Sequence, residues 1–514
     1  MPRCGTTLAL LCVCVCACAQ PQLHIAVSKR IPVEGDTVKL AAYLEGWQQP
    51  TTTGSVTFLV DHEGQLRPIG KSPMATNPAD PFETSIEWSP AKNGLYTILA
   101  SRHDAEQEAR LRVPVVVQER YFCFYGRTRP ELEWMTHHLT AGEPEVPALH
   151  ARGVMALKHR GGVSYIAGPR PRPEDIKADV DFAELAPRVI KDYTEVDPWD
   201  GIAIDELGMW DDHPVHTQLA LGFSQLLEQA RAAAPDKFMA TWQFGALTAL
   251  ECNMFRDSMD LIMCEVYQNY FRAWYDQHTF YEYLQQRIDM ARKMDVIKKT
   301  IIGLSIAKVY GGITPEELED QIRYIRAHGP EMPGLAFFTT SRCDNDVLKR
   351  ADECCYRYWV KPAVGLFSRA DLTLSDYQPE NLGIVRVGAT VHNVGGMDAQ
   401  NVKVRFWDGD PANGGTPVGG DKVIPRLPAA KWVDPEARDG ASWDPPEAVR
   451  RDGFGMVTVS VNWRARRGPH ELWAEVLPDP QYTTVRAFQS KRVSVRGTPR
   501  RLPVDAQPSV DPNE

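Results

Sequence analysis

The 514-residue sequence lacks the features that mark several large classes of protein. Beyond residue 19 it holds no apolar run near the roughly 20 residues that cross a bilayer, so no integral membrane segment is predicted. It has no excess of basic charge, because 57 Lys and Arg face 67 Asp and Glu, and the net charge of −10 argues against a nucleic-acid partner. Glycine and proline are scattered, which excludes collagen-like and low-complexity chains.

Cysteine is scarce where a disulfide framework would need it. Five of the 11 cysteines lie within the first 18 residues, and the other six all fall in the middle of the chain. No CxxC pair occurs, so neither a disulfide framework nor a zinc knuckle is predicted. We expect most of the six to be buried thiols, and the pattern leaves a bond between Cys343 and Cys354 or Cys355 open.

Three widespread catalytic and cofactor motifs are also missing. No GxGxxG and no GxxxxGK[ST] follows an apolar run, so the sequence predicts neither nucleotide binding nor a bound cofactor. No GxSxG occurs, which argues against a serine hydrolase. The remaining candidates for chemistry are carboxylates and aromatic side chains at the ends of predicted strands.

The first 19 residues have the pattern of a secretory signal. Arg3 precedes an apolar run over residues 8–19, which ends in the small-residue site Ala17-Cys18-Ala19. We therefore expect a secreted, periplasmic or cell-surface protein whose mature chain begins near Gln20. A lipid anchor at Cys18 is a second interpretation, because residues 15–18 loosely imitate a bacterial lipoprotein cleavage site.

The rest of the chain changes its hydrophobic period twice. Its length alone predicts about three domains. Residues 20–118 alternate apolar and polar residues in short runs separated by turns, which predicts an immunoglobulin-like β-sandwich. Residues 366–497 return to the same alternation and predict a second sandwich, whereas 498–514, rich in Pro, Asp and Arg, are expected to be disordered.

Residues 119–365 alternate short apolar runs with amphipathic helices, the pattern of a parallel sheet covered by helices. Seven apolar runs are visible, at 121–125, 154–158, 201–205, 238–244, 261–267, 300–306 and 334–339. The long gap between Lys158 and Gly201 suggests an eighth strand at 164–167. We therefore predict a multidomain protein with a central (β/α)8 TIM barrel rather than an open doubly wound sheet, flanked by two β-sandwiches.

Two strand ends carry carboxylates that should face the barrel interior. In the run that ends at Asp205, a side-chain period of 2 puts Ile202 and Ile204 on one face and Asp205 on the other. The same alternation places Glu265 with Tyr267, opposite an apolar face. With the eighth strand counted, Asp205 ends the fourth strand and Glu265 the sixth. Catalytic residues of such barrels lie at these C-terminal strand ends.

Residues 200–206 read Asp-Gly-Ile-Ala-Ile-Asp-Glu and look like the Asp-Gly-x-x-x-Asp-Glu strand end of the barrel glycoside hydrolases. That resemblance implies an enzyme that cleaves a poly- or oligosaccharide with two carboxylates. An Asp nucleophile on strand four with an acid on strand six is similar to retaining α-glycosidase families, endo-fucanases and α-galactosidase-like enzymes among them. It assigns Asp205 as nucleophile, Glu265 as acid/base and Glu206 as reserve acid. Leu207 stands where the chitinase pattern has its catalytic Glu, so chitinase chemistry is not expected.

Sugar recognition needs apolar ring faces and polar edges. The side chains at or just beyond the strand ends supply candidates of both kinds, namely Lys158, His159, Arg160, Trp210, Trp242, Gln243, Tyr267 and Gln268. The basic residues among them also suggest an anionic glycan, unless nearby acidic side chains neutralise them.

The second flanking domain resembles a known family. Residues 393–399 read Asn-Val-Gly-Gly-Met-Asp-Ala, residues 404–411 read Val-Arg-Phe-Trp-Asp-Gly-Asp-Pro, and residues 468–472 read Gly-Pro-His-Glu-Leu. Together they resemble the CARDB family of immunoglobulin-like modules related to bacterial adhesion. The resemblance implies an accessory β-sandwich of extracellular proteins and assigns no chemistry.

Two other function classes compete with hydrolysis by two carboxylates. The barrel could be inactive, so that the whole chain is a carbohydrate-binding surface protein. The segment Asp211-Asp212-His213-Pro214-Val215-His216 could instead hold zinc or manganese in a metal-dependent hydrolase, although the same pattern is typical of a helix entry with acidic residues at its positive end. The metal-free interpretation is preferred. The sequence does not indicate the sugar or the oligomeric state.

Overall fold

The computed structural model describes residues 22–44, 54–77, 80–102, 106–127, 132–162, 180–206, 216–275, 280–339, 343–431 and 455–497. The predicted signal segment with Cys18, the predicted tail at 498–514 and Trp210 lie outside these ranges. Within them, no helix combines the length and the apolar character that a membrane crossing requires. The six cysteines of these ranges are free thiols, and all except Cys343 are buried.

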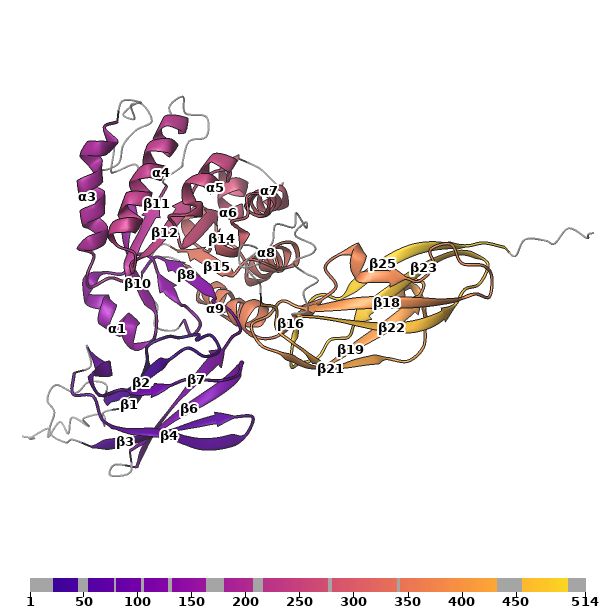
Figure 1. Cartoon of the computed structure of the whole chain (residues 1–514), viewed down its shortest axis with the longest axis horizontal. Helices are drawn as coiled ribbons and strands as arrows, with labels where there is room; N and C mark the ends of the chain where they lie inside the picture. The colour runs from indigo at the N-terminus through magenta and orange to yellow at the C-terminus, as the bar shows by residue number, and fades with distance from the viewer. Residues whose placement is uncertain are drawn as a thin grey trace, which may run out of the picture.

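Eight parallel strands form a closed barrel in the middle of the chain, which confirms the predicted fold class (Figure 1). The strands are β8 (Tyr121–Tyr125), β9 (His137–His138), β10 (Met155–Gly161), β11 (Gly201–Asp205), β12 (Phe238–Gln243), β13 (Leu261–Glu265), β14 (Thr300–Ser305) and β15 (Gly334–Phe338). The barrel closes where β15 pairs with β8.

The position predicted for the eighth strand is wrong. The strand that the sequence does not reveal is β9, which has two residues and pairs with β8 and β10. Residues 164–167 lie outside the described ranges, and β10 pairs directly with β11, so no strand separates these two. Because β9 also precedes Asp205, that residue still ends the fourth strand and Glu265 the sixth.

Helices surround the barrel: α1 (Val146–Ala151), α3 (Phe182–Thr194), α4 (His216–Ala233), α5 (Ala249–Arg256), α6 (Gln268–Tyr275), α7 (Phe280–Lys293), α8 (Pro315–His328) and α9 (Asn345–Cys355). Their apolar faces bury the outward side chains of the strands, such as Ile202 and Ile204, in the largest core of the molecule. Helix α8 begins in a capping box, in which Thr314 and Glu317 satisfy each other's backbone N–H groups.

Two antiparallel sheets precede the barrel. One contains β1 (Leu23–Val27), β2 (Val38–Leu44) and β5 (Ile86–Trp88), and the other β3 (Ser55–His62), β4 (Gln65–Pro73), β6 (Gly94–Arg102) and β7 (Gln107–Val115). Alternate residues of these strands form one core between the sheets, with Val38, Phe58 and Ile98 fully buried. This alternation is the period-2 pattern that predicts a sandwich.

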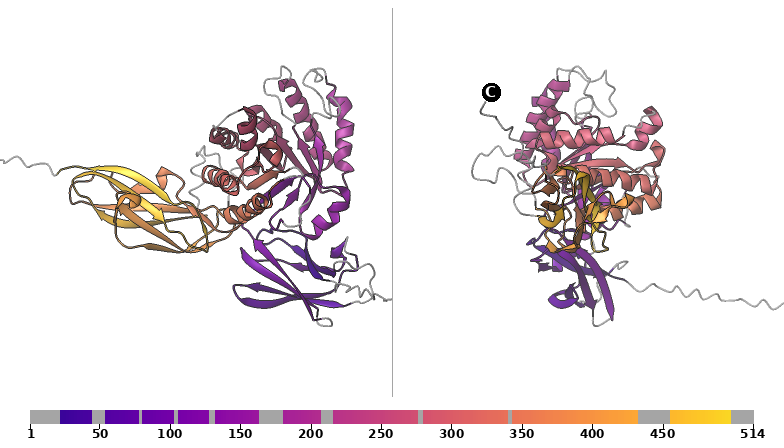
Figure 2. Two further views of the ribbon diagram at one scale, coloured as in Figure 1. Left: turned by 180° about the vertical axis from the view of Figure 1, so that it is seen from behind. Right: turned by 90° about the vertical axis from the view of Figure 1, so that its right-hand side faces the viewer.

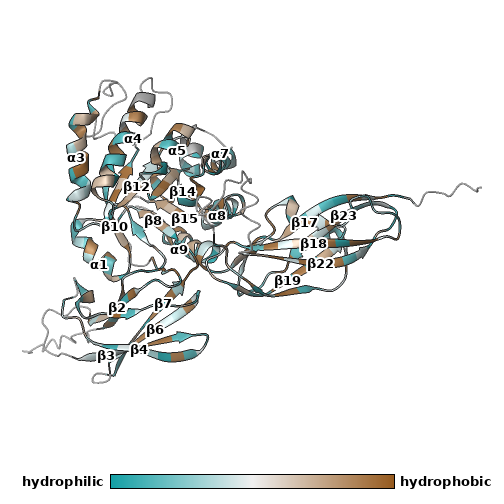
Figure 3. Ribbon diagram, in the orientation of Figure 1, coloured by the Kyte–Doolittle hydropathy of each residue, from teal (hydrophilic) through white to brown (hydrophobic). Residues whose placement is uncertain are grey.

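Two further antiparallel sheets follow the barrel. The first contains β16 (Ala363–Gly365), β17 (Leu372–Leu374), β18 (Ile384–Asn393), β22 (Met456–Arg464) and β24 (Thr483–Arg486). The second contains β19 (Ala399–Asp408), β20 (Thr416–Pro417), β21 (Lys422–Leu427), β23 (Gly468–Val476) and β25 (Phe488–Val495). Hydrophobic and hydrophilic colours alternate along the strands of both flanking domains (Figure 3).

A glycine-containing loop joins the three parts of the chain. Gly396 accepts a hydrogen bond from Val117 N–H at 3.1 Å, and Asp398 N–H donates to Asn93 Oδ1 at 2.8 Å. An added Cβ on Gly395 would lie 2.2 Å from Lys361 O, so no side chain fits this approach. The loop therefore anchors the C-terminal sandwich beside α9 and the N-terminal sheets, the arrangement seen from two further directions in Figure 2.

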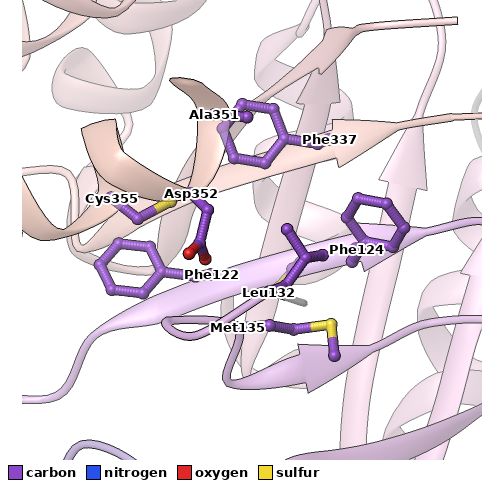
Figure 4. Close-up of a pocket in the computed structure, with 9 residues that line it drawn as sticks. Phe122, Phe124, Leu132, Met135, Phe337, Ala351, Asp352 and Cys355 are labelled. Carbon is purple, nitrogen blue, oxygen red and sulfur yellow. The ribbon is translucent and has the colours of Figure 1, made fainter. Parts of the chain in front are cut away.

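A small void lies between β8, β15 and α9 (Figure 4). Its volume is about 10 Å³, enough for one water molecule, and its lining is apolar except for the Asp352 carboxylate. Asp352 accepts hydrogen bonds from the backbone N–H groups of Glu133 and Trp134 at 3.0 and 2.9 Å. The carboxylate thereby holds the segment before β9 against α9, and the void carries no site.

Candidate active site

The C-terminal ends of the barrel strands form what we call the mouth. Asp205 ends β11 and Glu265 ends β13, so both carboxylates lie at this end. Their strand neighbours Ala203 and Met263 belong to the packed interior of the barrel, while Ile204 and Cys264 belong to the core between strands and helices. The side-chain alternation therefore places both acids on the inner face, as predicted.

Asp205 sits in a triangle of polar groups from three strands. Its Oδ2 accepts a hydrogen bond from the Tyr125 hydroxyl at 3.0 Å and lies 3.2 Å from His159 Nε2. The Tyr125 hydroxyl oxygen and His159 Nε2 are themselves 3.1 Å apart. Two neighbouring polar groups fix the orientation of this carboxylate, as a nucleophile requires.

Glu265 has different surroundings. Burial raises the pKa of this carboxyl group to about 8, although hydrogen bonds from Tyr267 and Trp242 oppose the shift. Trp242 Nε1 donates to Glu265 Oε2 at 2.8 Å and lies 3.1 Å from the Tyr267 hydroxyl. The indole has room because residue 303 is a glycine, where an added Cβ would lie 2.8 Å from the Trp242 ring. Burial thus favours the protonated form of Glu265.

Glu206 follows Asp205 in a left-handed backbone conformation with φ of 54°. Its backbone N–H donates to Trp242 O at 2.8 Å, which ties the end of β11 to β12. The side chain is exposed at the rim of the mouth. Partial desolvation by neighbouring groups and the negative charge of Asp205 raise the pKa of Glu206.

Aromatic rings connect the two acids and continue beyond them. The Tyr125 ring packs edge-on against Trp242, with 5.3 Å between ring centroids, so the partners of Asp205 and Glu265 touch. Further rings pack around these two, namely Tyr267, Tyr270, Tyr310 and Phe338. A pocket of about 280 Å³ opens beside Glu265, lined by Phe244, Gly245, Ala246, Glu265, Tyr267, Tyr270, Tyr283, Gln286 and Arg287.

The structure brings together five of the predicted residues, Asp205, Glu265, His159, Trp242 and Tyr267, and leaves Glu206 at the rim. It does not bring Lys158 or Arg160 to the interior. Both lie on the outer face of β10, where Lys158 stacks over Trp199 at 4.9 Å and Arg160 pairs with Asp192 of α3 at 3.1 Å. Alternation along β10 sends His159 inward and its two neighbours outward, so neither Lys158 nor Arg160 supports an anionic glycan.

The two predicted glutamines also lie away from the mouth. Gln243 is buried on the face of β12 opposite Trp242, where its amide donates to Thr241. Gln268 begins α6 and accepts a hydrogen bond from Gln321 of α8. Trp210 lies outside the described residues.

Sequence reasoning missed four aromatic residues of the mouth, Tyr125, Tyr270, Tyr310 and Phe338. The signal for Tyr125 was present, because it ends a predicted strand on the same face as Cys123, which lines the interior. Phe338 likewise ends a predicted strand. Tyr310 lies in a short turn after β14, where no period indicates a direction.

In the described part of the chain, no group of three or more His, Cys, Asp and Glu side chains is placed to hold a metal ion. The segment proposed for zinc or manganese, residues 211–216, has no side chain among those described. The described side chains of the mouth include two carboxyl groups in contrasting surroundings.

No family model matches the chain, and no curated protein sequence matches it. Among solved structures, the chain is similar to a Paenibacillus cycloisomaltooligosaccharide glucanotransferase, with 10% identity, a TM-score of 0.32 and coverage of 92% of this chain and 72% of that one. A β-D-glucuronidase of Dictyoglomus thermophilum has 11% identity, a TM-score of 0.33 and coverage of 66% and 69%. The CARDB domain of a Pyrococcus furiosus protein has 13% identity, a TM-score of 0.18 and coverage of 27% and 91%. At these values the similarities carry no argument about function.

Proposed function

We propose that the chain is a glycoside hydrolase whose barrel cleaves a glycosidic bond between Asp205 and Glu265. One observation carries the proposal: the two acids lie at the same barrel end in opposite environments. Hydrogen-bond donors surround Asp205, whereas burial keeps Glu265 protonated with a pKa of about 8. Carboxyl groups whose surroundings separate their protonation states are the pair that acid and nucleophile roles need.

The roles follow from protonation. Glu265 gives its proton to the glycosidic oxygen as the bond from that oxygen to the anomeric carbon breaks. Asp205 attacks the anomeric carbon and forms a glycosyl ester. Glu265, now a carboxylate, takes a proton from water, whose oxygen displaces Asp205 and releases the sugar. Retention of configuration requires the carboxyl groups to lie about 5 to 5.5 Å apart, and a separation of about 6.5 to 9.5 Å would mean inversion.

The aromatic rings of the mouth support a sugar substrate. Tyr267, Tyr310 and Phe338 pack with nearly parallel planes, at interplanar angles of 23° to 28°. Pyranose rings offer apolar faces to such surfaces and hydroxyl groups to polar ones. His159, beside Asp205, is the polar group placed to contact a substrate hydroxyl. We further propose that the enzyme is exported and that its CARDB-like sandwich is an accessory module.

The test is a screen of the purified chain against a panel of neutral and anionic polysaccharides. We expect release of reducing sugar from at least one polysaccharide and loss of that activity in Asp205→Asn. Asp192→Asn is the matched control, because Asp192 pairs with Arg160 outside the barrel interior and should leave the rate within about twofold.

The outcomes separate the alternatives. Proton NMR of the first product gives its anomeric configuration and decides between retention and inversion. Binding of a polysaccharide without release of sugar would contradict the proposal and favour an inactive, carbohydrate-binding barrel. Activity that survives in Asp205→Asn and disappears with a chelator would favour a metal-dependent hydrolase.

A further inference from the structure

A large cavity lies at the end of the barrel opposite the mouth, where the strands begin. Its volume is about 700 Å³, within the range of small-molecule sites in proteins. Tyr121, Met155 and Phe238, the first residues of β8, β10 and β12, form its barrel side. Residues 28–31 and Phe82 of the N-terminal domain form the other side. We call this cavity the lower pocket; Figure 1 shows the N-terminal sheets beside this end of the barrel.

The two sides of the lower pocket are fixed to each other before any ligand binds. Arg30 N–H donates to Gly153 O at 3.0 Å across the boundary between the domains. The Arg30 side chain is buried and donates to Glu133 O at 2.7 Å and Arg112 O at 3.0 Å. An added Cβ on Gly153 would lie 2.4 Å from Arg30 N, so the approach requires glycine. A preformed pocket reduces the ordering cost of binding.

A buried histidine in the lower pocket lacks one hydrogen-bond partner. His137 is 4% exposed, and its Nδ1 lies 2.8 Å from Thr136 Oγ1. Its Nε2 is itself buried from solvent and has no partner among the protein atoms of the described residues, so a ligand hydroxyl reaches it when a neighbouring side chain shifts. Buried polar atoms without a partner are rare and costly, so a ligand atom at Nε2 would remove this cost. Burial lowers the pKa of His137 to about 4, which keeps the ring neutral.

The rest of the lining selects the class of ligand. His137 lies between two rings, with centroids 5.3 Å from Tyr121 and 4.9 Å from Phe238. The charged groups of the wall are already paired, Lys29 with Glu119 at 2.8 Å and His150 with Asp200 at 2.9 Å. Aromatic faces favour an apolar ring surface, and paired charges favour a neutral ligand with polar edges.

We propose that the lower pocket is a second, non-catalytic binding site for a neutral saccharide of one or two rings. One hydroxyl of the saccharide hydrogen-bonds His137 Nε2, and its apolar ring face lies against Tyr121 and Phe238. A hydroxyl both donates and accepts, so it suits either tautomer of the imidazole. The site does not depend on the proposed hydrolysis, because its residues lie at the other end of the barrel from Asp205 and Glu265.

The experiment is a ligand-observed NMR titration of the full chain carrying Asp205→Asn, which prevents turnover. The probes are glucose, galactose, mannose, fucose, N-acetylglucosamine, maltose, cellobiose and lactose at millimolar concentration. We expect at least one of them to bind. His137→Phe keeps the ring packing and removes Nε2, and it should weaken that binding about three- to tenfold.

A second variant tests the site without altering the barrel core. Ser28 is exposed on the N-terminal wall, so Ser28→Trp should fold normally and fill the opening, abolishing binding. Phe244→Ala, in the pocket beside Glu265, is the matched control and should leave this binding unchanged. The proposal is overturned when no probe binds, or when binding survives both His137→Phe and Ser28→Trp. Binding that Phe244→Ala removes instead belongs to the mouth and also overturns it.

Discussion

The carboxylates at the two ends of the barrel have different kinds of partner. At the end where the strands begin, described carboxylates lie in ion pairs with Lys or Arg, Glu119 with Lys29 and Asp260 with Arg231. At the mouth, Asp205 has His159 and a tyrosine hydroxyl as partners, and Glu265 has an indole N–H. No Lys or Arg in the described ranges forms an ion pair with either acid.

This difference separates carboxylates that maintain the fold from carboxylates that are available for chemistry. An ion pair holds a carboxylate in one protonation state over a wide pH range. Hydrogen bonds from neutral groups orient a carboxylate without neutralising it, and burial without a cation keeps an acid protonated. The mouth contains one acid of each kind.

The largest expected effect tests the different catalytic roles proposed for the two acids at the mouth. With a glycoside of a poor leaving group, both Asp205→Asn and Glu265→Gln should lower kcat about a thousandfold. With the matching 2,4-dinitrophenyl glycoside, whose departure needs no acid, Glu265→Gln should retain formation of the glycosyl ester, seen as a burst of dinitrophenol. Asp205→Asn should show no burst. The reverse pattern would exchange the two roles.

A tenfold effect is expected from the hydroxyl that orients Asp205. Tyr125→Phe removes a donor 3.0 Å from Asp205 Oδ2 and keeps the ring against Trp242. We expect kcat to fall about tenfold, because the loss of one hydrogen bond to a charged group corresponds to roughly 1.5 kcal/mol. Thermal melting should change little. Tyr281→Phe on the outer helix α7 provides the control, and an equal fall in kcat there would argue against a specific role for Tyr125.

The pH dependence of activity should follow Glu265. Because the reaction needs Glu265 protonated, kcat/KM should fall as the pH rises through about 8. Trp242 donates to the Glu265 carboxylate and so lowers its pKa; Trp242→Phe should move the alkaline limb to higher pH. Trp199→Phe, outside the mouth, should leave the limb in place. An unchanged limb in Trp242→Phe would assign it to another group.

The smallest expected effect concerns stability at the other end. Hydrogen bonding to Asp200 raises the pKa of His150 above its ordinary value near 6.5. A pKa that is higher in the folded state adds stability that is complete below pH 6.5 and is lost as the pH rises through the folded value. The pair is partly exposed, so this amounts to less than about 1 kcal/mol.

Chemical unfolding at pH 6 and pH 9 measures this loss. The wild-type chain should lose more stability than His150→Gln between these pH values. Identical differences in the two proteins would contradict the assignment.

The strands and the inward-facing acids were predictable because both follow from the alternation of side chains along a strand. The alternation that buries Ile204 sends Asp205 inward, and the same rule applies to Glu265. The rule would also have excluded Lys158, Arg160 and Gln243 from the barrel interior, because each is next in sequence to an inward-facing residue of its strand. For choosing residues that face the barrel interior, proximity to a strand end was a weaker criterion than side-chain alternation.

The remaining parts of the site have no local signal. Strand β9 has two residues, too few for any period, and both are histidines. Gln268 lies at the start of a helix, where its direction depends on the contact with α8. Tyr125, His159 and Trp242 lie on other strands than the acids they contact, so these contacts follow from the closed barrel. Only Tyr267, two residues after Glu265, is a partner that local alternation indicates.

Because β9 is short, the strands of the barrel are not paired over equal lengths around its circumference. Two residue pairs join β9 to each neighbour, whereas five join β11 to β12. We therefore expect backbone amides of β9 to exchange with solvent deuterium sooner than those of β11, by transient separation of this seam. His137 lies on the seam and in the lower pocket, so a bound saccharide would slow the exchange. A ligand at the end of the barrel opposite the mouth would then reduce local opening of the barrel strands.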